Sequence, residues 1–289
     1  MSIGRSIRTF LSQEDVNFLL TNRIPRHALT RFMGWFARVK LPPVRAASIA
    51  VWKFFCDVDM ADAKDTQFAS LRDAFIRPLH DGARPVDADP RVIASPCDGI
   101  VGAFGRIEAG TALQVKGMPY PVADLLGSAE EAAAREGGWY VTLRLTAGMY
   151  HRFHAPHDIA VEQLRYISGD TWNVNPIALK RVERLFCKNE RAPITVRLEA
   201  SGKRLVLVPV AAVLVASIRL PWYDETHDVR CKGERVENLS ARFAKGQEMG
   251  WFEHGSTIVV LAPPDCPPVA DLCTGQTVRM GEALMRIDE

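Results

Sequence analysis

The tripeptide Gly255-Ser256-Thr257 has residue types that could cleave their own chain. A serine hydroxyl that follows glycine can attack the glycine carbonyl, because no side chain crowds that carbonyl and glycine tolerates the backbone strain of an N-to-O acyl shift. The resulting ester can eliminate to dehydroalanine, which hydrolyses to a pyruvoyl group at a new N-terminus. The same tripeptide is common in loops that lead into buried strands, so other segments have to decide between the two interpretations.

A second cluster, Tyr150 to His157, contains three of the seven histidines of the chain. Pro156 interrupts the helical spacing that groups histidines as metal ligands, and no H-E-x-x-H pattern is present, so we expect no metal site. In an ideal strand His151 and His154 would point to opposite faces, so both can serve one site only where the chain bends. Histidines that are merely hydrogen-bonded at a strand end are the alternative.

Asp98 lies in the turn-like segment Ser95 to Gly99 and could orient a histidine. Turns of this composition are abundant, and an aspartate in such a turn commonly closes the turn or caps the next element. The interpretation of Asp98 therefore depends on the rest of the chain, as does that of Ser256.

The composition is that of an ordinary globular protein, with 289 residues of which 47% are hydrophobic and 24% charged. The six cysteines include no C-x-x-C pair, so we interpret them as free thiols in a reducing compartment rather than as zinc ligands. The N-terminus lacks the unbroken apolar stretch of a secretory signal, and the longest apolar run, Leu205 to Ile218, is shorter than the roughly 20 residues of a spanning helix. We expect neither export nor a transmembrane span.

Positive charge is concentrated near the N-terminus. Residues 1–56 hold nine basic residues against Glu14 and Asp15, a net +7, whereas the whole chain carries +2. At helical spacing, apolar and aromatic side chains would lie on one face and these arginines on the other, which is typical of an interfacial membrane helix. The alternative is that the helices pack on their own domain, as most amphipathic helices do. An anionic membrane surface or a nucleic acid could both attract such a segment. Helical segments are expected over Val16 to Leu20, Leu29 to Val39 and Val44 to Phe55.

The acidic segment Asp57 to Asp65 predicts a boundary between a membrane-association region, 1–65, and a catalytic domain, 66–289. From Val92 onward the chain is rich in β-forming residues, so we predict an α+β fold with a β-rich catalytic core and an N-terminal amphipathic helical region. Further helices are expected over Phe68 to Phe75, Ala123 to Glu136 and Pro176 to Arg184. Strands are expected over Trp139 to Thr146, Ile194 to Ala200, Arg204 to Val208, Ala211 to Leu220 and Thr257 to Leu261, with Pro209 separating two of them.

Seven segments, in order and over nearly the whole chain, resemble the phosphatidylserine decarboxylase proenzymes of the bacterial membrane type. They are Phe75 to Asp87, Ser95 to Val101, Gln114 to Gly117, Tyr150 to Pro156, Gly169-Asp170 with Asn173 to Asn175, Leu185 to Arg191, and Lys245 to Thr257. The chain departs from the family pattern at His254, where leucine is usual, at Cys97, where alanine is usual, and in Pro209 to Ile218, which lacks glycines. His254 could alter the cleavage rate through a nearby titrating charge.

The resemblance implies a charge-relay triad of Asp98, His154 and Ser256 that cleaves the chain between Gly255 and Ser256. His154 would take the Ser256 proton, and Asp98 would fix the tautomer of the imidazole. The products would be a beta chain, 1–255, and an alpha chain, 256–289. His151 corresponds to the family's histidine of the decarboxylation step, for which proton delivery or ordering of the substrate carboxylate is the hypothesis.

The resemblance also implies a covalent pyruvate cofactor derived from Ser256, which forms a Schiff base with phosphatidylserine and yields phosphatidylethanolamine. The implied partners are phosphatidylserine, an anionic membrane surface and the chain's own cleavage products as a heterodimer, with a higher oligomer left open and no nucleic acid or metal. The expected location is peripheral, on the cytoplasmic side of the cell membrane. Two alternatives remain. One is a serine hydrolase that uses the same Asp98, His154 and Ser256, although the chain has no G-x-S-x-G elbow. The other is a non-catalytic membrane adaptor.

Overall fold

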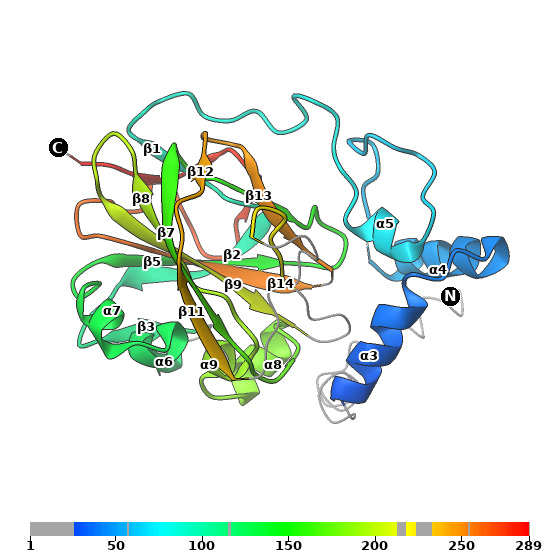
Figure 1. Cartoon of the computed structure of the whole chain (residues 1–289), viewed down its shortest axis with the longest axis horizontal. Coiled ribbons are helices and arrows are strands. Elements are labelled where there is room, and N and C mark those ends of the chain that lie inside the picture. The colour runs from blue at the N-terminus through cyan, green and yellow to red at the C-terminus, as the bar shows by residue number, and fades with distance from the viewer. Residues whose placement is uncertain are drawn as a thin grey trace.

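The computed structural model describes residues 26–56, 58–114, 117–212, 218–223, 233–253 and 255–288. A β-rich body forms most of the molecule, and three N-terminal helices lie beside it (Figure 1). The predicted α+β class with a β-rich core is confirmed, whereas the helix expected over Val16 to Leu20 lies outside the described residues. The described helices are α3 (Arg26–Phe36), α4 (Pro42–Phe55), α5 (Leu71–Phe75), α6 (Val122–Leu126), α7 (Ala129–Ala133), α8 (Pro176–Arg181) and α9 (Leu185–Lys188).

The strands of the body pair in antiparallel fashion. A nine-stranded sheet has the order β11-β7-β8-β9-β14-β5-β2-β15, with β12 paired to β7, and a three-stranded sheet has the order β10-β13-β6. Two small ribbons, β1-β16 and β3-β4, complete the described set. The strands are β1 (Val92–Ala94), β2 (Gly99–Arg106), β3 (Thr111–Leu113), β4 (Pro119–Pro121), β5 (Trp139–Leu145), β6 (Arg152–His154), β7 (Ile159–Ile167), β8 (Ile194–Leu198), β9 (Arg204–Ala211), β10 (Ile218–Arg219), β11 (Glu234–Asn238), β12 (Arg242–Phe243), β13 (Glu248–Phe252), β14 (Ser256–Ala262), β15 (Thr277–Val278) and β16 (Ala283–Arg286).

Strand β14 is buried over its whole length and lies between β5 and β9 in the middle of the large sheet. Because side chains alternate along a strand, Ile258 and Val260 pack into one core cluster, and Val259 and Leu261 pack into a second one on the opposite face. Helices α6 to α9 cover the second cluster. Ser256 lies two residues before Ile258, so its side chain is on the same face of β14 as Ile258 and Val260. Strands β6, β10 and β13 contribute residues to the core cluster on that face.

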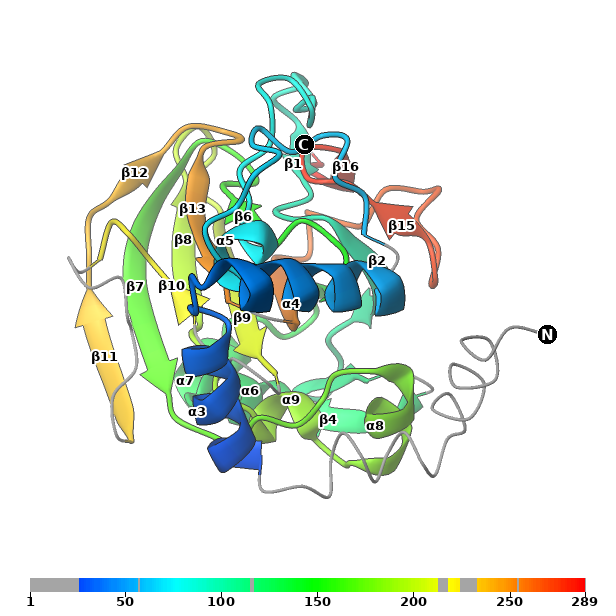
Figure 2. The same cartoon turned by 90° about the vertical axis from the view of Figure 1, so that its right-hand side faces the viewer.

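Helices α4 and α5, together with Ala37 just after α3, share a third apolar cluster that contains Trp52 and Phe75. The two rings lie 5.7 Å apart. The Trp52 indole also donates a hydrogen bond to the carbonyl of Ala147, just beyond the end of β5. Figure 2 shows α4 and α5 lying across the end of the body that holds β6 and β13. The N-terminal helices therefore contact the body close to the start of β14.

Among the expected elements, the helix over Ala123 to Glu136 and the strand break at Pro209 differ most from the structure. The single helix predicted over Ala123 to Glu136 is two short helices, because Gly127 has a φ of 68°, a left-handed conformation that ends α6, and Ser128 then caps α7. The break predicted at Pro209 is absent, and β9 runs through it. The register of β9 with β8 ends at Leu207, so Pro209 lies beyond that ladder and its missing N–H removes no bond from it.

No helix in the described part of the chain is long and apolar enough to cross a lipid bilayer.

Candidate active site

Ser256 is the first residue of β14, opposite Leu145 of β5 on one side and Ala211 of β9 on the other. Its side chain is fully buried, and its hydroxyl has no hydrogen-bond partner among the described residues. A buried hydroxyl left without a partner costs roughly 1–3 kcal/mol. The hydroxyl of Thr257, on the other face of β14, shares this property, so it is the preceding glycine that distinguishes Ser256 as a nucleophile.

Gly255 belongs to the connection between β13 and β14, which lie in different sheets. A Cβ added to Gly255 would meet no described atom within 4 Å. The space that a side chain at position 255 would occupy is therefore open among the described residues. His254, the family departure noted above, lies outside the described residues.

His154 ends β6 and is buried. Its Nδ1 lies 2.9 Å from the carbonyl of Gly246, which can only accept, so Nδ1 carries the proton and Nε2 is the acceptor. The Tyr150 hydroxyl lies 2.9 Å from Nε2 and donates to it. Burial lowers the pKa of His154 below its ordinary value of 6.5, so the ring is neutral and basic at neutral pH.

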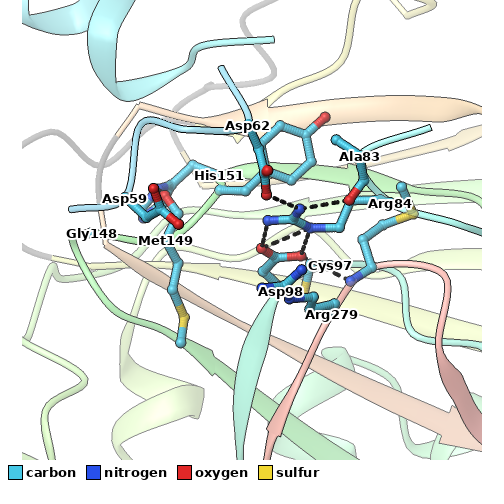
Figure 3. Close-up of polar contacts among 12 residues, drawn as sticks. Asp59, Asp62, Ala83, Arg84, Cys97, Asp98, Gly148, Met149, His151 and Arg279 are labelled. Atoms are coloured by element: carbon cyan, nitrogen blue, oxygen red, sulfur yellow. Dashed lines mark hydrogen bonds and ion pairs between the residues drawn. The ribbon is translucent and has the colours of Figure 1, made fainter. Parts of the chain in front are cut away.

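Asp98 lies between β1 and β2 and is also buried. Arg84 donates to its carboxylate from Nε at 2.9 Å and from Nη2 at 2.7 Å, and the Met280 backbone N–H donates at 2.9 Å. Arg84 also donates to Asp62 at 2.7 Å, so one guanidinium joins two carboxylates (Figure 3). The hydrogen bond from Arg84 lowers the pKa of Asp62.

Of the expected triad, Asp98 and His154 lie in one region, whereas the Ser256 hydroxyl has no hydrogen bond to either of them among the described residues, so no continuous relay is present there. The backbone N–H of His154 donates to the carbonyl of Pro96 at 2.7 Å, which places His154 beside the Asp98 turn. Within the described residues, however, the imidazole contacts Gly246 and Tyr150 rather than the Asp98 carboxylate.

His151 is fully buried beneath α5, and its ring centroid lies 3.9 Å from that of Phe75. Its Nδ1 lies 2.8 Å from the carbonyl of Met149. The carbonyl of His151 accepts a hydrogen bond from the N–H of Phe252 at 2.9 Å. The segment that carries His151 is thus joined to the end of β13, three residues before Gly255.

A cavity of about 230 Å³ adjoins Asp98 and Tyr150. Thr146, which follows the Ser256 partner Leu145, lines it as well. Its charged lining combines three basic and three acidic residues: Arg77, Arg84, Arg279, Asp59, Asp62 and Asp98. Such a lining suits a small ligand that carries charges of both signs.

Sequence reasoning did not identify Arg84, Tyr150 or Gly246 as parts of the site. All three lie within the segments that carry the family resemblance, but Arg84 is 14 residues from Asp98 and Gly246 is 92 residues from His154. Only the spacing of Tyr150 and His154, four residues apart across a bend, is a local signal.

Known proteins that are similar to this chain belong to one family. The family model described as "Phosphatidylserine decarboxylase" matches residues 71–286, and one described as "PSD" matches residues 17–51. Three curated relatives are each named "Phosphatidylserine decarboxylase proenzyme". The relative from Anaeromyxobacter sp. (strain K) is 37% identical over 269 residues, 90% of this chain and 94% of the relative.

The relative from Haemophilus influenzae (strain ATCC 51907 / DSM 11121 / KW20 / Rd) is 35% identical over 270 residues, 90% of this chain and 92% of its own length. That from Brevibacillus brevis (strain 47 / JCM 6285 / NBRC 100599) is 31% identical over 273 residues, 92% of this chain and 95% of its own length. These matches extend over both chains nearly end to end. The chain therefore belongs to the phosphatidylserine decarboxylase family.

Proposed function

We propose that this chain is a phosphatidylserine decarboxylase proenzyme, which cleaves itself between Gly255 and Ser256 and then converts phosphatidylserine to phosphatidylethanolamine. The observation that carries the proposal is the position of the Gly-Ser pair. Ser256 opens the central strand of the sheet with a buried hydroxyl that has no described partner, directly after a glycine whose surroundings are open.

Self-cleavage needs no external oxidant or reductant. The Ser256 hydroxyl attacks the Gly255 carbonyl, the peptide C–N bond breaks, and an ester replaces it. Elimination releases the Gly255 carboxylate and leaves dehydroalanine at position 256. Its enamine tautomerises to an imine, and one water molecule hydrolyses this imine to the pyruvoyl group with loss of ammonia. The balance is one water consumed and one ammonia released.

His154 is our proposed general base for the attack, because burial keeps it neutral and its Nε2 is the accepting nitrogen. Tyr150 occupies that nitrogen in the uncleaved chain, so its hydroxyl must either leave Nε2 or pass on the serine proton. Burial raises the pKa of Tyr150, which keeps the phenol protonated and able to donate. Gly246 fixes the tautomer, and Asp98 acts on the imidazole through its charge.

Position 256 fits the pyruvoyl group that the family uses. The serine side chain is small and buried, and Thr146, which lines the charged cavity, directly follows Leu145, the partner of Ser256 on β5. When present, the group supplies an electrophilic ketone for the substrate amine and accepts the electrons released with carbon dioxide. We assign His151 to proton delivery or to ordering of the substrate carboxylate, and we place the head group, with its ammonium, carboxylate and phosphate charges, in the cavity lined by Arg77, Arg84 and Arg279.

We also propose that residues 1–65 form the membrane-association region and residues 66–289 the catalytic domain. The protein would then be a peripheral membrane protein on the cytoplasmic side of the cell membrane. Helices α3 and α4 expose Phe32, Trp35, Phe54 and Phe55 to solvent by about half or more. Basic side chains lie among them, and each Lys or Arg near an anionic leaflet contributes about 1 kcal/mol of attraction. An apolar cavity of about 500 Å³ opens between α3 and α4, which gives acyl chains a place beside the bilayer.

The test is the intact mass of the denatured protein, followed by decarboxylation of phosphatidylserine. The proposal predicts two chains, 1–255 and 256–289, with the smaller one lighter by one ammonia than a free serine terminus requires. Replacing Ser256 by alanine should leave one inactive chain, whereas a hydrolase would be labelled at Ser256 by a fluorophosphonate. A full-length wild-type chain of unchanged mass after prolonged incubation would refute the proposal.

A further inference from the structure

Glu253, two residues before the Gly255–Ser256 bond, is a buried carboxylate in an unusual environment. Its side chain is 1% exposed, and arginines from three separate parts of the fold approach it. Arg72 contacts Oε1 from Nε at 2.6 Å and from Nη2 at 2.5 Å. Arg38 donates to Oε2 at 2.9 Å, and Arg219 reaches the carboxylate at 3.3 and 3.5 Å.

The arginine cluster, defined as Arg38, Arg72 and Arg219, joins the N-terminal helices to the body. Arg38 follows α3, Arg72 lies on α5, and Arg219 lies on β10, which pairs with β13. The backbone N–H of Arg72 also donates to the carbonyl of Ala37 at 2.8 Å, which fixes α5 against the end of α3. The carboxylate of Glu253 is therefore the point at which three elements meet.

Glu253 is held there as an anion. Burial by itself raises the pKa of Glu253, but the surrounding guanidinium charges outweigh burial, so that its pKa lies below the ordinary value of 4.5. One carboxylate faces three cations, and each contact is a charge-assisted hydrogen bond or an ion pair. Removing the negative charge would leave the arginines to repel one another around a buried site.

The scissile bond lies between two fixed points. On the C-terminal side, Ser256 is already in the ladder with β5 and β9. On the N-terminal side, Phe252 donates to the carbonyl of His151, and Glu253 is held by the arginine cluster. Gly255 has no side chain of its own to hold it. The position of its carbonyl therefore depends on these two anchors.

We propose that Glu253 is a positioning residue for self-cleavage, and that its contacts with the arginine cluster hold the Gly255 carbonyl within reach of the Ser256 hydroxyl. The inference rests on the proposed self-cleavage of this chain. It assigns Glu253 to the first step, the acyl shift, and gives it no part in the later elimination or in decarboxylation. Displacing a reacting carbonyl by about 1 Å can slow a reaction by about 100-fold, so the loss of this anchor has a measurable consequence.

The experiment follows the conversion of newly synthesised full-length chain into its two fragments, resolved on a denaturing gel over time. Glu253→Gln keeps the shape of the side chain and removes its charge, and we expect cleavage slowed by about 100-fold. Arg72→Gln removes the closest cation, with a smaller effect in the same direction. Glu162→Gln is the matched control, because Glu162 also pairs with two arginines, Arg197 and Arg204, and lies on β7.

Folding and the affected step are measured separately. Each substitution is also made together with Ser256→Ala, and thermal denaturation of these uncleavable chains shows which of them fold. If the Glu253→Gln chain does not fold, Arg72→Gln carries the test. Hydroxylamine is then added to the slow variant, because it splits an ester but not a peptide bond. With the acyl shift impaired, we expect no recovery of the cleavage rate.

Two outcomes would overturn the inference. One is cleavage of a folded Glu253→Gln chain, or of Arg72→Gln in its place, at the rate of Glu162→Gln. The other is full recovery of the rate with hydroxylamine, which would show that the ester forms normally. Failure of the wild-type and Glu162→Gln chains to cleave would instead refute the proposed function. The two failures are therefore distinguishable.

Discussion

The ion-pair network around Arg84 should dominate the stability of the uncleaved site. Arg84 is 10% exposed and joins Asp98, which is 9% exposed, to Asp62. Replacing it by glutamine leaves the Asp98 carboxylate buried with the Met280 N–H as its remaining described partner. The substitution thus leaves a buried carboxylate without its paired cation, which costs more than the loss of one contact.

The expected magnitude follows from that burial. Removing one partner of a buried ion pair typically destabilises a protein by about 3–5 kcal/mol. For chains of this size, 1 kcal/mol shifts Tm by roughly 2 °C, so R84Q should lower Tm by about 6–10 °C. The matched control is R197Q, since Arg197 is 41% exposed and pairs with Glu162 at 3.0 Å. A pair this exposed is worth at most about 1 kcal/mol, which corresponds to about 2 °C.

The assay is thermal denaturation of each variant in the Ser256→Ala chain, so that cleavage does not change the species being measured. D98N and the double variant R84Q/D98N complete a mutant cycle. Because the double variant removes both charges, we expect it to melt above R84Q. A Tm for R84Q within about 2 °C of the parent, or a double variant that melts below R84Q, would refute the reasoning that a stranded Asp98 charge is the cause.

Three further predictions concern the base and the membrane. Y150F removes the donor that stabilises neutral His154, so the pKa of His154 should rise in an NMR titration of the uncleavable chain, and an unchanged or lower pKa would contradict the assigned contact. Since the folded pKa of His154 is below 6.5 and its neutral form is the base, the rate of self-cleavage should be flat above pH 6.5 and fall only as pH drops through that lower pKa. A rate that still climbs steeply above pH 7 would exclude His154 as the titrating base. W35A/F54A should weaken binding to anionic vesicles in a flotation assay without lowering Tm. V236A, at an exposed apolar position on β11, should leave vesicle binding unchanged.

The positions of the main strands could be predicted from the sequence because their burial is visible in it. Five consecutive apolar residues after Thr257 predict a strand buried on both faces, and β14 is such a strand, extended by a residue at each end. The strand predicted from Trp139 ends at Leu145, one residue earlier than expected. Local patterns suffice where both faces of a strand are apolar.

Backbone conformation at single residues was harder to predict. Alanine and leucine before Gly127 and alanine and glutamate after it favour one helix, and a glycine within a helix is tolerated. Gly127 instead ends α6 in a left-handed conformation, and a Cβ there would lie 2.7 Å from Ile167 of β7, so packing against that strand also requires glycine. At Pro209 the sequence predicted a break that the structure lacks. The effect of this proline on β9 depends on where β8 stops pairing with it. Neither neighbour is close in the sequence.

In the candidate site, too, the residue types could be predicted from the sequence, whereas their hydrogen-bond partners could not. A glycine before a serine, a histidine-rich bend and an aspartate turn can be recognised in the sequence, but hydrogen bonds between them depend on how distant segments meet. Asp98 is held by Arg84 and by Met280, 182 residues away, and Glu253 by an arginine that lies 181 residues before it. In both places a buried carboxylate needs cations that only the fold supplies. Two further pairs, Arg38 with Glu253 and Asp62 with Arg84, join residues 1–65 to residues 66–289, and the first of them lies two residues before the bond that the chain is proposed to cleave.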